Sequence, residues 1–249
     1  MTKRKPLQAK RPATWQEFLD AVRDARNDLG NPKEVWYRGQ SRDYYSMIPS
    51  LLRHPQGVSK ERALFDDYER SAARLHAKRS NDWELLIDMQ HYGIPTRLLD
   101  WTDVLGVALA FALYDSHDDH EDSAVYILDP VKLNDLSGID KIKRVPNEKK
   151  FKYKSIYWQG DPFKAVFPIA IDCALQNDRL VAQNGSFTVH GSKHDAIDDL
   201  APKCVRKIII GSAIKPAARE FLEHANLNAF SIYPDIVGMA RHISRKHLI

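Results

Sequence analysis

The apolar and polar positions of this chain follow two different periods, and the helical period dominates the first half. Leu85 and Met89 lie at helical spacing, and the pattern stops at Gly93, with Pro95 close behind. Glycine followed by proline is typical of a helix C-terminus. A second apolar helix is predicted to begin at about Val104.

Further helices are predicted on either side of this central pair. Thr14 and Glu17 have the spacing of a capping box, which would open an amphipathic helix over residues 14–28. Residues 60–79 read as a long helix, and residues 214–224 as another that tolerates a proline in its first turn.

Strands are predicted mainly in the second half. Residues 123–129 and 205–210 give the strongest signals, because β-branched residues are bounded there by charge, glycine or proline. Shorter extended segments are predicted at 35–40, 166–171, 179–181, 186–189 and 230–233. Helices followed by strands indicate a single α+β domain, with the helices packed around a small, mostly antiparallel sheet core.

The 249 residues suit one domain with an arm, and the formal net charge is +4. We divide the chain into a basic flexible arm, residues 1–12, and a single domain, residues 13–249. A second basic stretch covers residues 141–154, and the adjoining segment 151–158 reads either as a basic-aromatic pattern or as a plain strand. Both basic stretches read as solvated surface; the alternative is weak contact with the phosphates of a nucleic acid.

Several classes of protein and site are disfavoured. Cys173 and Cys204 have neither metal-ligand nor disulfide spacing, which favours a reducing, cytoplasmic setting. No apolar run approaches the roughly 20 residues that span a bilayer, and the N-terminus lacks the apolar stretch of a signal peptide. Dinucleotide-fold, P-loop, zincin and hydrolase-elbow motifs are missing from the sequence. The histidines and aspartates of residues 117–120 read as a solvated turn, so we predict no metal site.

Polar residues crowd between the two central helices. Thr96, Arg97, Asp100 and Thr102 fall within seven residues. Such groups are costly to bury unless they are paired. The segment therefore lines a site or forms a buried polar network, in which Arg97 and Asp100 would pair with each other.

Candidate ligand groups also occur outside this segment. Arg38 would offer a planar, charged fork to a phosphate or carboxylate, although a structural salt bridge is the alternative. Gly39 would let a ligand or another backbone approach closely. His91 is either a general acid or base, or a helix-end capping or core residue, and Tyr92 either stacks on a ligand ring or packs in the core.

A third group of candidates precedes Gly185. Asn184 and Gly185 match a hairpin signal, so they are interpretable as purely conformational. Gln183 has no such role in the turn, and its amide would suit recognition of a ribose or a base.

Three motifs resemble those of the FRG domain, a bacterial and phage family named for its Phe/Tyr-Arg-Gly motif. They are WYRGQ at residues 36–40, GIPTRLLDWT at 93–102 and RLVAQNGSFTV at 179–189. The resemblance implies a single FRG-type domain with a motif core at about residues 35–189. The context of the family implies a role in phage–host conflict.

The Tyr-Arg-Gly motif is also similar to the first motif of the arginine-serine-glutamate class of ADP-ribosyltransferases. In those enzymes this arginine helps to hold the pyrophosphate or ribose of NAD. Residues 96–102, followed by 108–111, are similar to the second motif, and residues 183–187 to the turn of the third. The resemblance extends to the fold, which would be ADP-ribosyltransferase-like.

One position departs from that pattern. Arg179 stands about where the transferases place a catalytic glutamate, and no glutamate lies between Glu148 and Glu220. A carboxylate would be needed to stabilise the oxocarbenium-like state of the ribose. Either an aspartate has taken the role, with Asp100 first, then Asp178 and Asp235, or the chemistry is absent.

We therefore expect a cleft that binds a nucleotide-like ligand, with NAD as a substrate and no covalently bound cofactor. Asp100, with His91 as a lesser option, would carry any acid–base chemistry in glycosidic cleavage or ADP-ribosyl transfer. The ligand-binding residues would be Arg38, Gly39, Gln40, Tyr92, Thr96, Arg97, Gln183 and Asn184. The alternative is a non-catalytic module that binds nucleic acid or protein, in which these residues form a structural polar network.

Overall fold

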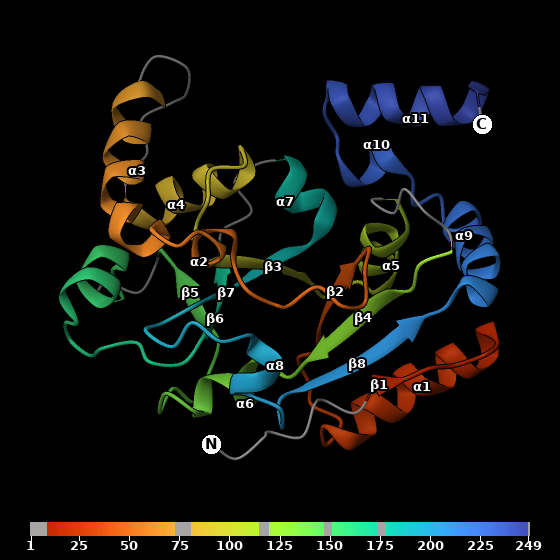
Figure 1. Cartoon of the computed structure of the whole chain (residues 1–249), viewed down its shortest axis with the longest axis horizontal. Coiled ribbons are helices and arrows are strands. Elements are labelled where there is room, and N and C mark those ends of the chain that lie inside the picture. Colours follow the sequence, from red (N-terminus) through yellow and green to blue (C-terminus); the bar gives the residue numbers. More distant parts are fainter. Residues whose placement is uncertain (1–8, 73–80, 115–119, 147–150, 174–177, 249) are drawn as a thin grey trace.

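The computed structural model describes residues 9–72, 81–114, 120–146, 151–173 and 178–248. In this part of the chain, eight strands form one sheet in the order β1-β8-β4-β2-β3-β7-β6-β5 (Figure 1). The strands are β1 (Ala9–Lys10), β2 (Trp36–Gln40), β3 (Leu98–Thr102), β4 (Ser123–Leu128), β5 (Lys143–Val145), β6 (Ile169–Cys173), β7 (Gly185–Val189) and β8 (Val205–Ile210).

Helices connect and cover these strands, which confirms the predicted α+β class. The longer ones are α1 (Trp15–Asp28), α3 (Gly57–Ala72), α4 (Asp82–His91), α5 (Leu105–Tyr114), α9 (Lys215–His224) and α11 (Ile236–Leu248). The shorter ones are α2 (Ser50–Arg53), α6 (Pro130–Asp135), the π-helix η1 (Lys154–Gln159), α7 (Asp178–Gln183), α8 (Ile197–Leu200), the 3₁₀-helix η2 (Ser212–Ile214) and α10 (Ala229–Ile232).

The sheet consists of two halves that meet at a single residue pair. β2 and β3 are antiparallel neighbours, but they pair only through Tyr37 and Thr102. By contrast, β2 pairs with β4 over five residues, and β3 pairs with β7 over five. All neighbouring strands are antiparallel except β1 with β8 and β5 with β6. The weak seam between β2 and β3 leaves the two strands free to diverge beyond Tyr37 and Thr102.

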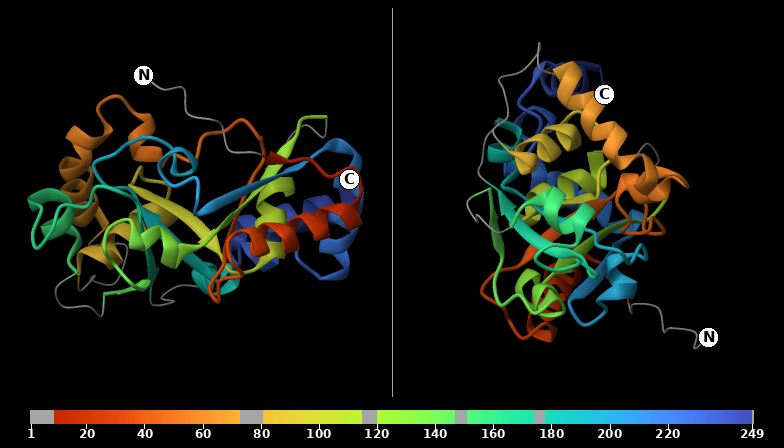
Figure 2. Two further views of the ribbon diagram at one scale, coloured as in Figure 1. Left: turned by 90° about the horizontal axis from the view of Figure 1, so that it is seen from below. Right: turned by 90° about the vertical axis from the view of Figure 1, so that its left-hand side faces the viewer.

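Side chains alternate across the sheet and build a core on both faces. Val125 and Ile127 of β4 pack with Phe18 of α1 and Leu109 of α5, whereas the intervening Tyr126 belongs to a cluster on the opposite face. α6 and α8 contribute to this opposite cluster. In the other half of the sheet, α3, α4 and η1 cover β3, β6 and β7. Figures 1 and 2 show α3 and η1 at one end of the long axis, with α1 and α9 at the other.

Local sequence signals explain why α1 and β2 begin and pack where they do. The hydroxyl of Thr14 accepts a hydrogen bond from the backbone N–H of Glu17 at 3.2 Å, as the capping pattern predicts. The Glu17 carboxylate reaches one residue further than a capping box requires and accepts from the N–H of Ala13 at 2.8 Å. On β2, a Cβ added to Gly39 would lie 1.9 Å from the carbonyl oxygen of Ala108, so glycine here permits contact with the backbone of α5.

Four short segments differ from their predicted structure. Residues 179–181 belong to helix α7 and residues 230–232 to helix α10, although both were predicted to be extended. Most of the aromatic segment 151–158 forms the π-helix η1 instead of a strand. Residues 9 and 10, assigned to the flexible arm, form β1 beside β8. Residues 1–8, the end of the predicted 60–79 helix and residues 117–119 lie outside the described residues.

Both cysteines are buried as free thiols. Every helix in the described ranges is too short or too polar to cross a lipid bilayer.

Candidate functional site

A pocket of about 320 Å³ lies between β2 and β3, beyond the single pair that joins them. β2 contributes Arg38 and Gln40 to its wall, and β3 contributes Asp100. The opposite wall comes from α7 and from the loop after α10, through residues that include Gln183 and Tyr233. The pocket thus occupies the space that the diverging strands leave open, and segments distant in sequence build it.

Positive charge dominates this pocket. Arg38, Arg53 and Arg179 line it, and Asp100 is the only carboxylate among the described lining residues. Burial lowers the pKa of Arg38, Asp100 raises it, and Arg53 lowers it further. An arginine remains cationic under such a shift because its ordinary pKa is so high. The pocket is therefore suited to an anionic ligand.

Two buried polar atoms in the pocket wall lack a hydrogen-bond partner among the described residues. They are Nε of Arg38 and Oε1 of Gln40. Gln40 is only 6% exposed, so its carbonyl oxygen has little access to water. One end of the Arg38 fork is occupied, because Nη1 donates to the backbone carbonyl of Asp100 at 2.7 Å. Buried polar groups are normally paired, so these two atoms are exceptions among the described residues.

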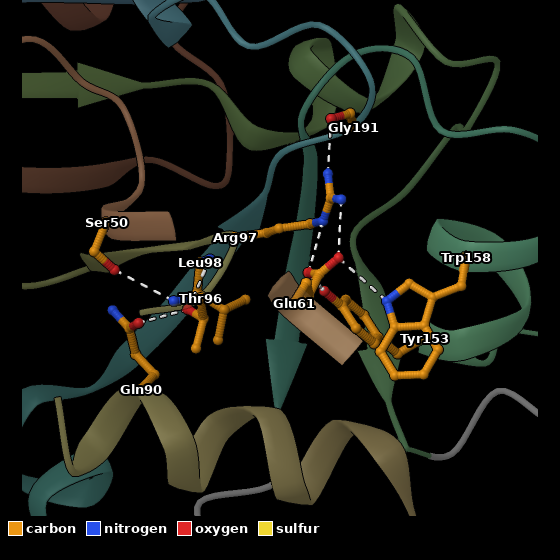
Figure 3. A network of polar contacts seen from close by, with 9 residues as sticks. All are labelled: Ser50, Glu61, Gln90, Thr96, Arg97, Leu98, Tyr153, Trp158 and Gly191. Atoms are coloured by element: carbon orange, nitrogen blue, oxygen red, sulfur yellow. Dashed lines mark hydrogen bonds and ion pairs between the residues drawn. The ribbon is translucent and has the colours of Figure 1, made fainter. Parts of the chain in front are cut away.

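Asp100 is half-exposed, and side chains from α4 and the adjoining loop hold it. Its Oδ2 accepts from Nε2 of Gln90 at 2.9 Å, and it lies 3.8 Å from Nη1 of Arg38. Oε1 of Gln90 in turn accepts from the hydroxyl of Thr96 at 2.6 Å (Figure 3). Thr96 is buried and does not line the pocket. Its hydroxyl orients the Gln90 amide.

Gln183 lines the pocket but also ties its wall together. Its Nε2 donates to the carbonyl of Ile232 at 3.1 Å, and its own backbone carbonyl accepts from the hydroxyl of Thr102 at 2.6 Å. Gln183 thus connects β3, α7 and α10. Residues 183–185 do not form a hairpin turn, because they join helix α7 to β7, with Asn184 at a φ of 46°.

Arg97 does not pair with Asp100. It is buried and donates through Nε and Nη2 to the two carboxylate oxygens of Glu61, at 2.8 and 2.9 Å. Trp158 and Tyr153 of the π-helix region also donate to Glu61, and Arg97 donates to the carbonyl of Gly191 (Figure 3). This network joins α3, β3 and η1, and Arg97 is not among the residues that line the pocket.

The other sequence candidates lie at or beyond the margin. His91 lines a small hollow next to the pocket, which shares Asp100 and Arg179 with it. Tyr92 is exposed and stacks edge-on against His91, with 4.7 Å between ring centroids. Asn184 faces another hollow, where its side-chain amide donates to Asp103 at 2.5 Å. The structure thus brings Arg38, Gly39, Gln40, Asp100 and Gln183 to one pocket.

Of the two aspartates offered as further substitutes for the missing glutamate, neither lines the pocket. Asp178 begins α7 and is exposed. Asp235 accepts from the backbone N–H of Gly238 at 2.7 Å and so caps the start of α11. Asp100 is the candidate that the pocket retains. No cluster of three potential metal-ligating side chains occurs among the described residues.

Some pocket residues were not singled out in the sequence as ligand-binding candidates. They include Arg53 and also Arg179, which stands where the transferase resemblance leads one to expect a glutamate. The guanidinium of Arg179 lies 4.8 Å from the centroid of the Tyr233 ring, and Tyr233 meets Phe111 edge-on at 5.7 Å. Arg179 and Tyr233 are far apart in the sequence, and only the fold brings the two together.

Comparison with known proteins identifies part of the chain. Residues 33–121 match the model of the family described as FRG domain. The match contains Arg38, Gln90 and Asp100, whereas Arg179, Gln183 and Tyr233 lie beyond it. No curated protein and no solved structure matches the chain. The chain therefore carries an FRG domain over residues 33–121, and this domain supplies one side of the pocket.

Proposed function

We propose that the pocket between β2 and β3 binds a nucleotide-like ligand that carries phosphate, and that NAD is this ligand. The observation that supports it best is the convergence of Arg38, Arg53 and Arg179 around a single carboxylate, Asp100. Guanidinium groups are the side chains best suited to phosphate. The side chain of Arg38 is 18% exposed, which leaves part of it open to such an anion.

The size of the pocket limits how such a ligand would bind. Ligand pockets span roughly 300–1,000 Å³, and at about 320 Å³ this one is at the lower end. It would enclose one nucleotide half of NAD. The half-exposed ring of Tyr45 at the rim offers a surface for an aromatic ring of the ligand.

The proposed reaction is cleavage of the bond between nicotinamide and ribose. The bond from C1′ to the nicotinamide nitrogen breaks, and its electron pair leaves with neutral nicotinamide. The carboxylate of Asp100 would stabilise the positive charge that develops on the ribose. Water, or the nucleophile of an acceptor, then adds to C1′ and releases a proton, which gives ADP-ribose or an ADP-ribosylated product. A role in phage–host conflict would follow from depletion of NAD or modification of a target.

The test follows nicotinamide release from NAD by the wild type, Asp100→Asn and Arg38→Lys. Asp100→Asn keeps the shape and removes the charge, so release should fall by roughly 100- to 1,000-fold, the range for loss of one electrostatic stabiliser. Arg38→Lys keeps the charge and removes the fork, so it should weaken NAD binding. Asp67→Asn and Arg23→Lys make the same changes at exposed ion pairs on α3 and α1 and should leave both properties intact.

The second candidate is a binding module without catalysis. The Glu61–Arg97 network favours it, because one prominent polar motif residue finds its partners within the fold and not in the pocket. A thermal shift with NAD but no nicotinamide release would support this candidate. If the wild type shows no nicotinamide release and no thermal shift with NAD, NAD is refuted as the ligand.

A further inference from the structure

A second groove lies on another part of the molecule, where β1, β8, the end of α1 and α6 come together (Figure 1). Its volume is about 720 Å³, and none of its described lining residues also lines the pocket between β2 and β3. The groove is therefore independent of the site proposed for NAD.

The lining of this groove is strongly basic. Its charged residues are Lys10, Asp28, Lys132, Lys203, Arg206 and Lys207. Asp28 is the only carboxylate among the described residues that line it. The ammonium of Lys207 is engaged outside this lining, where it donates to the carbonyl of Asp43 and lies 5.6 Å from the centroid of the Tyr126 ring. The other four cations against one anion make this a concentrated patch on a chain whose net charge is only +4.

Most of this positive charge has no carboxylate partner in the described part of the chain. Lys10 pairs with Asp24 at 3.1 Å, and both side chains are about half-exposed. Arg206 contacts only backbone carbonyls, those of Asp28, Pro202 and Val205. Lys132 and Lys203 form no ion pair with any described residue. Carbonyl contacts hold the Arg206 guanidinium in place without neutralising its charge, so the groove retains a positive field.

The groove lacks aromatic side chains among its described lining residues. Proteins that hold single-stranded nucleic acid generally stack its bases on aromatic rings, and this groove provides none. Contact with a phosphate backbone needs only cations and is independent of base sequence. In the sequence, Lys3, Arg4 and Lys5 precede β1 closely, so the positive charge continues in the chain that leads to the groove.

From these observations we propose that the groove formed by β1, β8, α1 and α6 binds the phosphate backbone of duplex nucleic acid. The contact is electrostatic and does not discriminate between base sequences. Lys132, Lys203 and Arg206 carry it, with Arg206 held in position by its three carbonyl contacts. The NAD site would then operate on a protein held at a nucleic acid.

The experiment measures the affinity of the full chain for a short labelled DNA duplex between about 50 and about 200 mM salt. Each phosphate contact contributes about 0.9 to the slope of log affinity against log salt. Lys132→Ala combined with Lys203→Ala should therefore make the slope shallower by about 1.8. The matched control combines Arg70→Ala and Arg144→Ala, two cations that are 81% and 80% exposed and lie outside the groove.

Binding measurements with other ligands, made in parallel, identify the partner. Duplexes of unrelated sequence should bind equally, and a single strand should bind more weakly. Melting curves of both double variants should match the wild type. Lys132 and Lys203 form no ion pair with a described residue, and the ion pairs of Arg70 and Arg144 are exposed, so they contribute little to stability. The proposal is overturned if the wild type shows no salt-dependent binding, or if both double variants lose affinity alike. Equal binding of polyglutamate or of anionic vesicles would overturn the assignment to nucleic acid.

Discussion

Gln90 donates its side-chain amide to the carboxylate of Asp100, with 2.9 Å between Nε2 and Oδ2. Thr96 is compatible with this orientation of the amide. Its Oγ1 accepts from the N–H of Leu98 and donates its own hydrogen to Oε1 of Gln90. Gln90 thus presents its NH₂ group to Asp100, which suits an ionised carboxylate. In the proposed reaction Gln90 is a positioning residue.

Gln90→Glu should alter the pH dependence of nicotinamide release. The substitution places a second carboxylate beside Asp100, and two such groups in contact share a proton. The acid limb of the pH profile should move to higher pH, by about one pH unit or more. Gln90→Ala removes the hydrogen bond without adding a second charge, so it should lower the rate and move the limb by less than Gln90→Glu does. Identical pH profiles for Gln90→Glu and wild type would contradict this role.

Breaking the Glu61–Arg97 pair should destabilise the fold without altering the pocket. Removal of one partner leaves a buried, uncompensated charge, which costs about 3–5 kcal/mol. Arg97→Ala and Glu61→Ala should each lower the free energy of unfolding by this order in a denaturant titration. The combination Glu61→Gln with Arg97→Met should cost less than either, since no charge is stranded. A double variant with fully additive losses would argue against this account.

His190 should make stability depend on pH. It is fully buried, and burial lowers the pKa of its imidazole from 6.5 to about 3. The unfolded chain takes up a proton below about 6.5, whereas the folded protein does so only near 3. The stabilising contribution is therefore complete above about 6.5 and is lost as the pH falls through this window, by about 1.4 kcal/mol per unit. Equilibrium unfolding of His190→Gln should show a flatter dependence between these values, and the exposed His224→Gln should follow the wild type.

Gly39→Ala should disrupt the contact between β2 and α5. The new Cβ would lie 1.9 Å from the carbonyl oxygen of Ala108, which is backbone and cannot rotate away. Overpacking of this kind costs about 1–3 kcal/mol or more. Gly211→Ala is the control, because its nearest neighbour would be 3.6 Å away and its φ is −72°. Similar melting temperatures for the two variants would refute the steric explanation.

Long elements with strong local signals were predictable from the sequence. β8 occupies the predicted residues, and α1 begins at the Thr14 cap. Short segments were not predictable, because three or four apolar residues fit a strand or one helical turn equally well. The residues of α10 are such a case, and the decisive signal was the cap, in which the side chain of Asn228 accepts from the N–H groups of Phe230 and Ser231.

Prediction of the site was limited by partners distant in sequence. Arg38 and Asp100 could be proposed because each lies in a motif with an unusual density of polar residues. The pairing of Arg97 with Glu61 could not be predicted, because Glu61 lies 36 residues away in another helix. Asp100 was the nearer carboxylate in the sequence. Arg179 reaches the pocket only because residues 178–183 form a helix.

The seam at Tyr37 and Thr102 bears on where this protein can be truncated. A fragment covering residues 33–121 would contain β2 and β3 but lose β4 and β7, their principal partners. Two strands that share one residue pair cannot form an independent sheet, and their bare edges would promote aggregation. The boundaries of the matched segment therefore do not delimit an autonomous folding unit, and expression trials should retain the chain through β8.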